Sequence, residues 1–351
     1  MIRALLSSCA KLSLAEATIF GIAKLVGGST KKSAPSVVNR EIDAVYLWVN
    51  DGDPKWQAKR QQFRPTAEST VATAASRFRQ FNELLTSIKL LSVNAPFVRK
   101  VFVVVDDQEP NLSGLGHDLP FEIVLVNHSE FIPEKYLPTF NSRAITAHLH
   151  LIPGLSENFL YLNDDVFIAS PSEVNDWFDG NGIRVRFTET RFPGLDTLAS
   201  NEVLYRARWK GVQLAKAKDW PVDDRMPQHA PYPLTRTILK KLWDVFPTAM
   251  EETATARFRT ASAILPEQLA FYFAAGNGLA TPAENLTYKY VPMNEASGIF
   301  PVVDLALKPN RFLTICLNDV SEVPSNNQIS ERALLKRYAR VLRYLESAAG
   351  Q

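Results

Sequence analysis

Short apolar runs recur along the chain with the length and composition of buried β-strands. Polar or turn-forming residues follow each run, as is usual where a strand ends. The runs occupy residues 42–49, 99–105, 121–126, 157–162 and 311–317. We therefore predict a β-strand at each of these places.

Other segments carry apolar residues three and four positions apart, the spacing that places them on one face of a helix. This spacing predicts helices over residues 80–93, 142–152, 199–218, 233–245, 261–275 and 328–347. In the first half of the chain strands and helices alternate, which is typical of βαβ units with parallel strands. The predicted fold class is α/β, with a largely parallel sheet flanked by helices and an added helical region.

The same pattern suggests how the chain is organised. Residues 1–36 are expected to form an amphipathic segment and a linker, packed on the domain or touching a membrane surface. Lys11, Glu16 and Lys24 interrupt the apolar runs of this segment, so we expect no membrane-spanning helix there. We then expect a first core part at 37–190, a mainly helical insertion at 191–285, and a late strand with a C-terminal helix at 286–351.

Composition narrows the class of protein. The chain has 351 residues, of which 46% are hydrophobic and 22% are charged, so it is expected to fold around a sizeable core. Its 39 basic and 37 acidic residues leave a formal charge of only +2, which argues against a nucleic-acid partner. Cys9 and Cys316 form no disulfide framework, which favours a reducing compartment.

Carboxylates gather where the predicted strands end. Parallel strands present their carboxyl ends along one edge of a sheet, where ligands commonly bind. The acidic residues at these ends are Asp51, Asp53, Asp106, Asp107, Asp164 and Asp165. The adjacent pair Asp164 and Asp165 could hold Mg²⁺ or Mn²⁺, whose preferred ligands are oxygen atoms, or could lie in a surface turn capped by Asn163.

Three further segments carry candidate chemistry. His229 lies in the proline-rich loop QHAPYPL before a predicted helix, where it could act as a general base or simply be solvated. Arg257 and Arg259 could bind a diphosphate through their planar guanidinium groups, or could form surface ion pairs. The late strand ends in Asn318 and Asp319, repeating the Asn-Asp pattern after residue 162, so we expect one shared polar site.

Taken together, these segments resemble the Stealth family. That family includes bacterial capsule sugar-1-phosphate transferases and the catalytic subunit of the animal lysosomal-enzyme N-acetylglucosamine-1-phosphotransferase. The resemblance runs through four blocks: IDAVYLWVNDGDPKW; SRFRQFNELLTSIKLLSVNAPFVRKVFVVVDDQEP with LPTFNSRAITAHLHLIPGLSENFLYLNDDVFI; HAPYPLTRTILKKLWDVFP with ARFR; and ICLND. The chain departs from the family at Lys89, where arginine is usual, and in the WVNDGDP segment.

The resemblance implies a nucleotide-sugar-binding core of Rossmann-like or GT-A-like type. It also implies transfer of a hexose 1-phosphate, such as N-acetylhexosamine 1-phosphate, from a UDP-sugar to a hydroxyl of a growing polysaccharide, releasing UMP. The implied catalytic residues are His229, Arg259, Asp319 and Asp165, and the implied Mg²⁺ or Mn²⁺ ligands are Asp164, Asp165 and Asp319. The expected substrate-binding residues are Trp48, Asn50, Asp51, Gly52, Asp53, Arg77, Asn82, Asp106, Asn141, Asn163 and Asn318.

Two other functions stay open from the sequence. One is a metal-dependent glycosyltransferase that releases UDP, and the other is a catalytically silent carbohydrate-binding subunit. The expected partners are a nucleotide-sugar donor and an oligosaccharide or polysaccharide acceptor. We expect a cytoplasmic protein, with peripheral contact at the inner face of a bacterial membrane through its N-terminus.

Overall fold

The structure is a computed structural model of the whole chain. It describes residues 40–64, 81–191, 203–223, 225–283, 287–295, 302, 311–319 and 330–348. The predicted segment 1–36 and the expected substrate-binding residue Arg77 lie outside these ranges. Residues from Arg40 onward form one compact unit, and the finer boundaries expected within it stay predictions.

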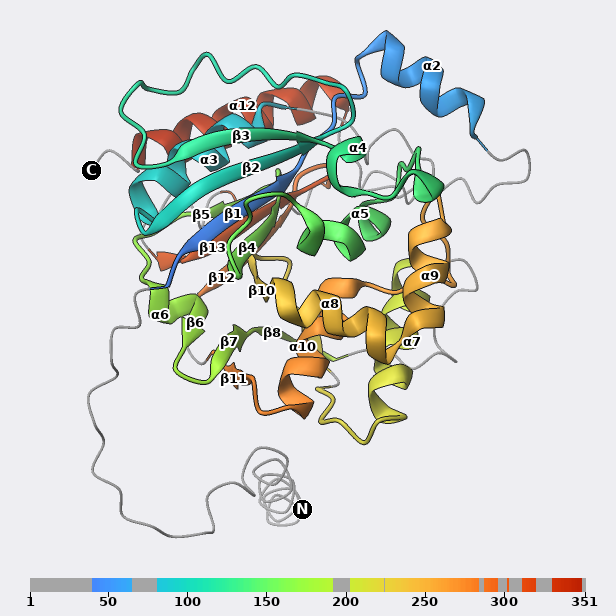
Figure 1. The fold of residues 1–351 in the computed structure, drawn as a ribbon. Helices are drawn as coiled ribbons and strands as arrows, with labels where there is room; N and C mark the ends of the chain where they lie inside the picture. Colours follow the sequence, from blue (N-terminus) through green and yellow to red (C-terminus); the bar gives the residue numbers. More distant parts are fainter. Residues whose placement is uncertain are drawn as a thin grey trace, which may run out of the picture. The chain divides into compact units, whose positions relative to one another are not determined.

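The largest sheet in the described part of the chain is built mainly from parallel strands (Figure 1). Its order is β10 (Tyr232–Thr235), β4 (Asn158–Asn163), β1 (Ile42–Leu47), β2 (Val98–Val105) and β3 (Glu122–Asn127). β1 pairs in parallel with β2 and β4, β2 pairs in parallel with β3, and only β10 runs antiparallel. The predicted α/β class with a largely parallel sheet is therefore confirmed.

A second sheet brings a strand from near the C-terminus beside the turn that follows β4. β5 (Val166–Ile168) follows β4 after a turn of two residues and pairs antiparallel with β13 (Thr314–Asn318). β12 (Tyr288–Pro292) completes this sheet in parallel with β13. The backbone N–H of Leu317 donates to the carbonyl oxygen of Asp165 at 2.9 Å. The carboxyl end of β13 is thereby held against the turn between β4 and β5.

Smaller strands extend the lower part of the fold in Figure 1. One sheet contains β6 (Phe178–Asp179), β7 (Gly182–Val185) and β11 (Ala280–Pro282), and another contains β8 (Phe187–Arg191) and β9 (Arg225–Pro227).

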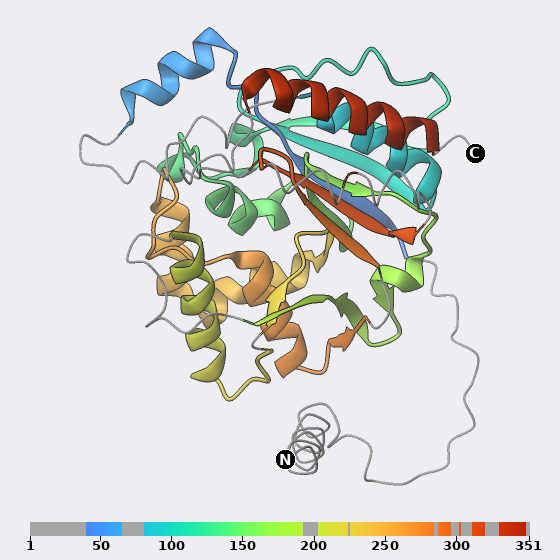
Figure 2. The ribbon, with the colours of Figure 1, turned by 180° about the vertical axis from the view of Figure 1, so that it is seen from behind.

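Two groups of helices lie on opposite sides of the strands (Figures 1 and 2). α3 (Glu83–Asn94) packs on β5, and α12 (Glu331–Ala348) packs on α3. The other group consists of α5 (Ser142–His148), α7 (Val203–Lys216), α8 (Arg236–Val245), α9 (Pro247–Thr255) and α10 (Pro266–Gly276). The shorter helical segments are α2 (Pro54–Gln62), α4 (His128–Phe131), η3 (Glu134–Tyr136), η4 (Leu149–Leu151) and α6 (Val174–Trp177). Among the helices described, none combines the length and apolarity needed to cross a bilayer.

Most predicted elements are confirmed, with shifted ends, but the helix predicted over residues 233–245 is wrong at its start. Its first residues form β10, and α8 begins only at Arg236, after Thr235 caps it by accepting a hydrogen bond from the N–H of Ile238 at 3.0 Å. Pro233 has no N–H to donate, which an edge strand tolerates. His229 therefore precedes a strand and not a helix.

Candidate active site

The candidate site lies where the strands of both sheets end. Because β1 pairs Leu47 with Val104 of β2 and with Asn163 of β4, the carboxyl ends of these three strands adjoin. The turn after β4 and the end of β13 meet at the same place. The strand ends that the sequence predicts to form one polar edge therefore adjoin in the structure.

His229 reaches this edge from the loop between β9 and β10. The N–H of Gln228 donates to the carbonyl oxygen of Arg186 at 3.2 Å, which anchors the start of the loop. On its other side, β10 pairs Tyr232 with Tyr161 of β4. The imidazole consequently lies against Asn163, with 2.7 Å between the amide Nδ2 and His229 Nε2.

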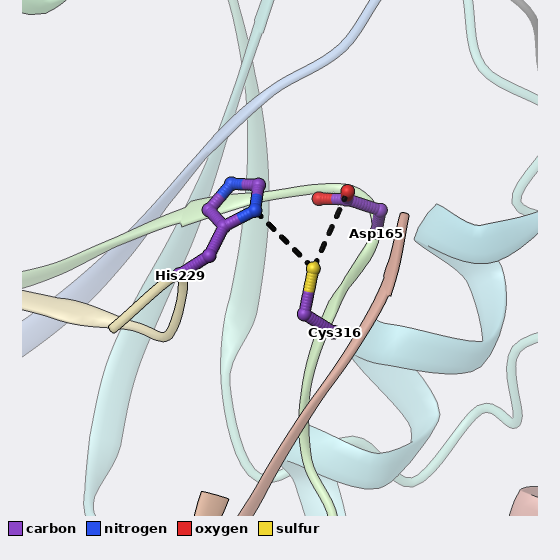
Figure 3. Close-up of side chains that lie close together, drawn as sticks. All are labelled: Asp165, His229 and Cys316. Carbon is purple, nitrogen blue, oxygen red and sulfur yellow. Dashed lines mark hydrogen bonds between the residues drawn. The ribbon is translucent and has the colours of Figure 1, made fainter. Parts of the chain in front are cut away.

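The hydrogen bonds of Asn163 determine which imidazole nitrogen carries the proton. The Tyr161 hydroxyl donates to Asn163 Oδ1 at 3.1 Å, so the amide Nδ2 faces His229 and donates to Nε2. Nε2 is then the unprotonated nitrogen. Nδ1 carries the proton and points at the sulfur of Cys316, 3.2 Å away (Figure 3). The Asn318 amide lies 3.5 Å from the same nitrogen.

Asp165 stands on the other side of the Cys316 sulfur (Figure 3). The thiol donates to Asp165 Oδ2 at 3.6 Å, whereas the buried Oδ1 has no hydrogen-bond partner. Burial raises the pKa of Asp165 to about 7, while the thiol, the backbone and Arg259 partly offset that effect. A buried carboxylate oxygen without a donor suits a bound cation.

The charge state of His229 follows from its surroundings. Burial, together with smaller contributions from the neighbouring cations Arg208 and Arg259, lowers the pKa of His229 to about 4. The imidazole is therefore neutral at physiological pH and has a lone pair on Nε2. A neutral imidazole can accept a proton during a reaction.

Further carboxylates surround Asp165. Glu83 is buried at the start of α3, where its Oε2 accepts a hydrogen bond from the N–H of Phe81 at 2.6 Å. Burial raises the pKa of Glu83, and the charges of Asp164 and Asp165 raise it further. Burial raises the pKa of Tyr338, and the charges of Glu83, Asp165 and Asp319 raise it further, so Asp319 acts electrostatically on the same buried hydroxyl as Glu83 and Asp165.

These residues fit Mg²⁺ or Mn²⁺ by the chemistry of their donors. Both ions prefer carboxylate and other oxygen ligands. Asp164, Asp165 and Asp319 could provide such oxygens. Sequence reasoning missed Glu83, although a glutamate within the NELL segment at a helix start was a usable signal.

Two arginines, Arg259 and Arg208, place positive charge near the site. Arg259 Nη2 donates to Ser142 Oγ at 2.8 Å, and its charge influences His229, Asp165 and the buried Glu267. Arg208 of α7 acts on His229 and Glu267 in the same way. Sequence reasoning did not single out Arg208 or Glu267, which belong to α7 and α10, far along the chain from β4. Arg257, the other arginine expected to bind a diphosphate, is exposed, and its guanidinium lies 4.7 Å from the centre of the Phe63 ring.

Asn141 was expected to bind substrate, and its side chain is completely buried. Its Nδ2 donates to the carbonyl oxygen of Ala256 at 2.8 Å, and its Oδ1 accepts from the N–H of Arg143 at 3.2 Å. Asn141 therefore caps α5 and holds the segment that leads to Arg259, which makes it a positioning residue.

The first-block loop forms a separate, internally bonded part of the same edge. Gln108 braces it, since the N–H of Asn50 donates to Gln108 Oε1 at 2.9 Å and Gln108 Nε2 donates to Asn50 O at 2.8 Å and to Asp53 Oδ2 at 3.2 Å. The N–H of Gly52 donates to Asn50 Oδ1 at 2.9 Å, and Asp51 is partly buried beside it. Sequence reasoning missed Gln108.

The remaining predicted residues lie around this loop and at the start of α3. The N–H of Trp48 donates to the carbonyl oxygen of Val104 at 3.1 Å, which continues the β1–β2 pairing. Asp106 is buried and pairs with Lys59 at 2.6 Å. Asn82 is exposed, with φ of 68°, directly before Glu83. Lys89, where the family usually has arginine, pairs with Glu346 of α12 at 3.1 Å.

Comparison with known proteins gives the site a family context. The sequence models of Stealth conserved regions 1, 2 and 3 match residues 40–67, 77–186 and 228–275. Except for Ser76 at the start of the second block, these ranges include the first three of the four blocks identified from the sequence. The fourth block, with Asn318 and Asp319, stays a resemblance.

Characterised relatives extend the match. The chain is 33% identical over 299 residues to a capsular polysaccharide phosphotransferase of Haemophilus influenzae, covering 82% of this chain and 79% of the relative. It is 30% identical over 313 residues to one of Aeromonas hydrophila, covering 85% and 84%. An exopolysaccharide phosphotransferase of Streptomyces coelicolor is 37% identical over 253 residues, which cover 71% of this chain but only 42% of that protein. The structure of mouse xyloside xylosyltransferase 1 aligns with 81% of this chain over 99% of its own length. The TM-score is 0.39 and the sequence identity is 9%, so this similarity carries no argument about the site.

Proposed function

The chain belongs to the Stealth family, and from this membership we propose that it is a polysaccharide phosphotransferase that transfers a sugar 1-phosphate. The proposed donor is a UDP-N-acetylhexosamine and the acceptor is a hydroxyl of a growing polysaccharide. The observation that carries the proposal is the convergence of His229, Asp165 and Asn318, from three distant segments, at the carboxyl edge of the sheet.

In the proposed reaction, the acceptor hydroxyl oxygen attacks the phosphorus attached to the donor sugar. The bond from this phosphorus to the bridging oxygen of the diphosphate breaks, so that UMP leaves and a phosphodiester forms. The proposed base is His229; its Nε2 lone pair accepts the Asn163 amide hydrogen bond in this structure, so the acceptor hydroxyl must displace that amide before its proton passes to Nε2. Such reactions depend mainly on positioning and on stabilisation of the developing charge.

The donor would lie along the sheet edge. The braced loop of Asn50, Gly52 and Asp53 offers polar groups for the base and ribose, and Arg259 offers a guanidinium for the phosphate oxygens. Mg²⁺ or Mn²⁺, when bound by Asp164, Asp165 and Asp319, would neutralise charge on the diphosphate.

Donor binding would also make His229 a better base. Arg208 and Arg259 contribute to the lowered pKa of His229, after burial as the main cause. A bound diphosphate would neutralise these positive charges and raise the pKa of His229 toward the operating pH. Its basicity would therefore be linked to the presence of the donor.

Product analysis tests the proposal. The purified chain is incubated with UDP-sugars, Mg²⁺ and an oligosaccharide acceptor, the released nucleotide is identified, and the polymer is examined by phosphorus NMR. We expect UMP and a phosphodiester resonance. Release of UDP without a phosphodiester would instead indicate a glycosyltransferase, and no turnover with any donor would indicate a binding subunit.

Matched variants tie the activity to this site. His229→Ala and Asp319→Asn should each reduce kcat by at least about 100-fold, as expected for groups that act on the transition state. His117 and Asp118 are adjacent in the sequence and exposed, and they provide the matched controls His117→Ala and Asp118→Asn, which should keep normal turnover. Near-normal turnover of either site variant would remove that residue from the mechanism.

A further inference from the structure

Three donor atoms of different chemical kinds converge beside the proposed Mg²⁺ ligands. They are the Cys316 sulfur, the His229 Nδ1 and a carboxylate oxygen of Asp165, and all lie within 4.8 Å of one another. Figure 3 shows the three side chains pointing at a common centre from β13, from the loop before β10 and from the turn after β4. The sulfur lies 3.2 Å from Nδ1 and 3.6 Å from Asp165 Oδ2.

These separations are close to the edges of a tetrahedral metal site. A metal bonded to sulfur at about 2.3 Å and to nitrogen or oxygen at about 2.1 Å separates such ligands by about 3.6 Å. The observed 3.2 and 3.6 Å are close to this value, and the third pair of donor atoms lies within 4.8 Å. Two of the three donors are also of the wrong kind for Mg²⁺, which prefers oxygen ligands in octahedral geometry.

We infer that Asp165, His229 and Cys316 form a binding site for a borderline-soft divalent cation of the Zn²⁺ class. Binding breaks the S–H bond of Cys316, forms the sulfur–metal bond and releases one proton to solvent, while the proton on His229 Nδ1 moves to Nε2, so that the ligating imidazole stays neutral and the Asn163 amide turns its oxygen toward Nε2. Three protein ligands leave the fourth position open for water.

The local charges favour such an ion. A thiolate and a carboxylate together balance two positive charges, so the occupied site would be close to neutral. Asp165 Oδ1 is buried without a hydrogen-bond partner, and Glu83 and Asp164 add negative potential nearby. The positive charges of Arg208 and Arg259, which also act on His229, oppose the ion.

Occupancy would inhibit the enzyme. The site uses His229 Nδ1 and Asp165, so a bound Zn²⁺ would fix the imidazole and withdraw the carboxylate from Mg²⁺. This consequence rests on the proposed function, whereas the metal site itself does not.

Cobalt spectroscopy tests the site without any turnover. Co²⁺ is added to the full chain after reduction and removal of metals, and the spectrum is recorded. We expect one equivalent to give a thiolate-to-cobalt charge-transfer band and the strong visible bands of tetrahedral cobalt. Zn²⁺ should abolish both bands, and excess Mg²⁺ should leave them.

The second cysteine of the chain supplies the matched control. Cys9→Ser should keep the charge-transfer band and Cys316→Ser should lose it. His229→Ala should weaken Co²⁺ binding by at least about 10-fold, since even outer-shell changes cost roughly 10–100-fold in metal affinity. Circular dichroism and thermal melting check that each variant is folded. Absence of the band in the unmodified chain, or its survival in folded Cys316→Ser, would overturn the site.

A second measurement tests the inhibition. At fixed Mg²⁺, Zn²⁺ should inhibit UMP release by the Cys9→Ser chain and should need at least about 10-fold more metal with Cys316→Ser. Equal zinc sensitivity of the two variants would refute the inhibitory role. If no donor supports turnover but the cobalt band depends on Cys316, the proposed function fails and the metal site stands.

Discussion

The tautomer of His229 leads to a sharp prediction for Asn163. In the present structure the Asn163 amide donates to Nε2 at 2.7 Å, which requires that nitrogen to be unprotonated. Asn163→Asp replaces the donor with a carboxylate of nearly the same shape. The carboxylate can only accept, so it should draw the imidazole proton to Nε2 and stabilise the doubly protonated ring.

The size of the effect follows from the distance. Opposite charges about 4 Å apart interact by about 4 kcal/mol at an effective dielectric constant near 20, which corresponds to roughly 3 pKa units. The pKa of His229 is about 4 in the native protein, where burial and two arginines lower it. Asn163→Asp should therefore bring the pKa of His229 to about 7.

Nitrogen-15 NMR of histidine-labelled protein can measure both the tautomer and the pKa. Only five histidines contribute signals, and His229→Gln identifies the relevant one. The native protein should show protonated Nδ1 and unprotonated Nε2 near neutral pH, and Asn163→Asp should show a ring that titrates near neutrality. The uncharged variant Asn163→Leu separates loss of the amide from gain of charge, since it should raise the pKa far less.

Two outcomes would refute this reasoning. One is a native His229 that carries its proton on Nε2, since the amide could not then donate to it. The other is an Asn163→Asp variant whose His229 still titrates near pH 4, since the carboxylate would then not face the ring.

Three further predictions concern stability and positioning. His150 is buried, and its pKa is lowered to about 4. The unfolded chain binds a proton at this histidine near pH 6.5 and the folded chain does not, so the free energy of unfolding falls as the pH is lowered. His150→Gln should remove about 2 kcal/mol of this loss between pH 6.5 and 5, measured by denaturant titration. Arg99 donates two hydrogen bonds, of 3.0 and 2.8 Å, to the fully buried Asp43. Arg99→Met should therefore lower the free energy of unfolding by about 3 kcal/mol. A loss below about 1 kcal/mol would contradict the assigned pair. Asn141→Ala frees the segment before Arg259 and should reduce kcat at least about 10-fold, since misplaced catalytic groups lose rate; restoration by Asn141→Asp would contradict the role of its Nδ2 donor, which aspartate lacks.

Much of the fold could be predicted from the sequence because it depends on local patterns. The runs at 42–49 and 99–105 became β1 and β2, since a continuous apolar segment bounded by polar residues can be buried only as an interior strand or helix. The alternation with helices indicated parallel strands, and parallel strands bring their carboxyl ends together. The grouping of Asp165, His229 and Asn318 could thus be expected from the pattern and from the family resemblance.

Other features depend on contacts between distant segments. Residues 232–235 carry no strong strand pattern of their own, and they form β10 because β4 offers an unpaired edge. Local propensity, which favoured a helix there, is weaker than this long-range pairing. The buried state of Glu83 and the approach of Arg208 likewise arise only when α3 and α7 pack at the site.

The sequence by itself determined the fold class, the strand-end carboxylates and the family. Only the tertiary structure decided the proton position on His229, the elevated pKa of Asp165 and the meeting of Cys316 with both. The physical reason is that residue types set which groups are present, whereas burial and the distances between groups far apart in the chain set their charge states and their possible ligands.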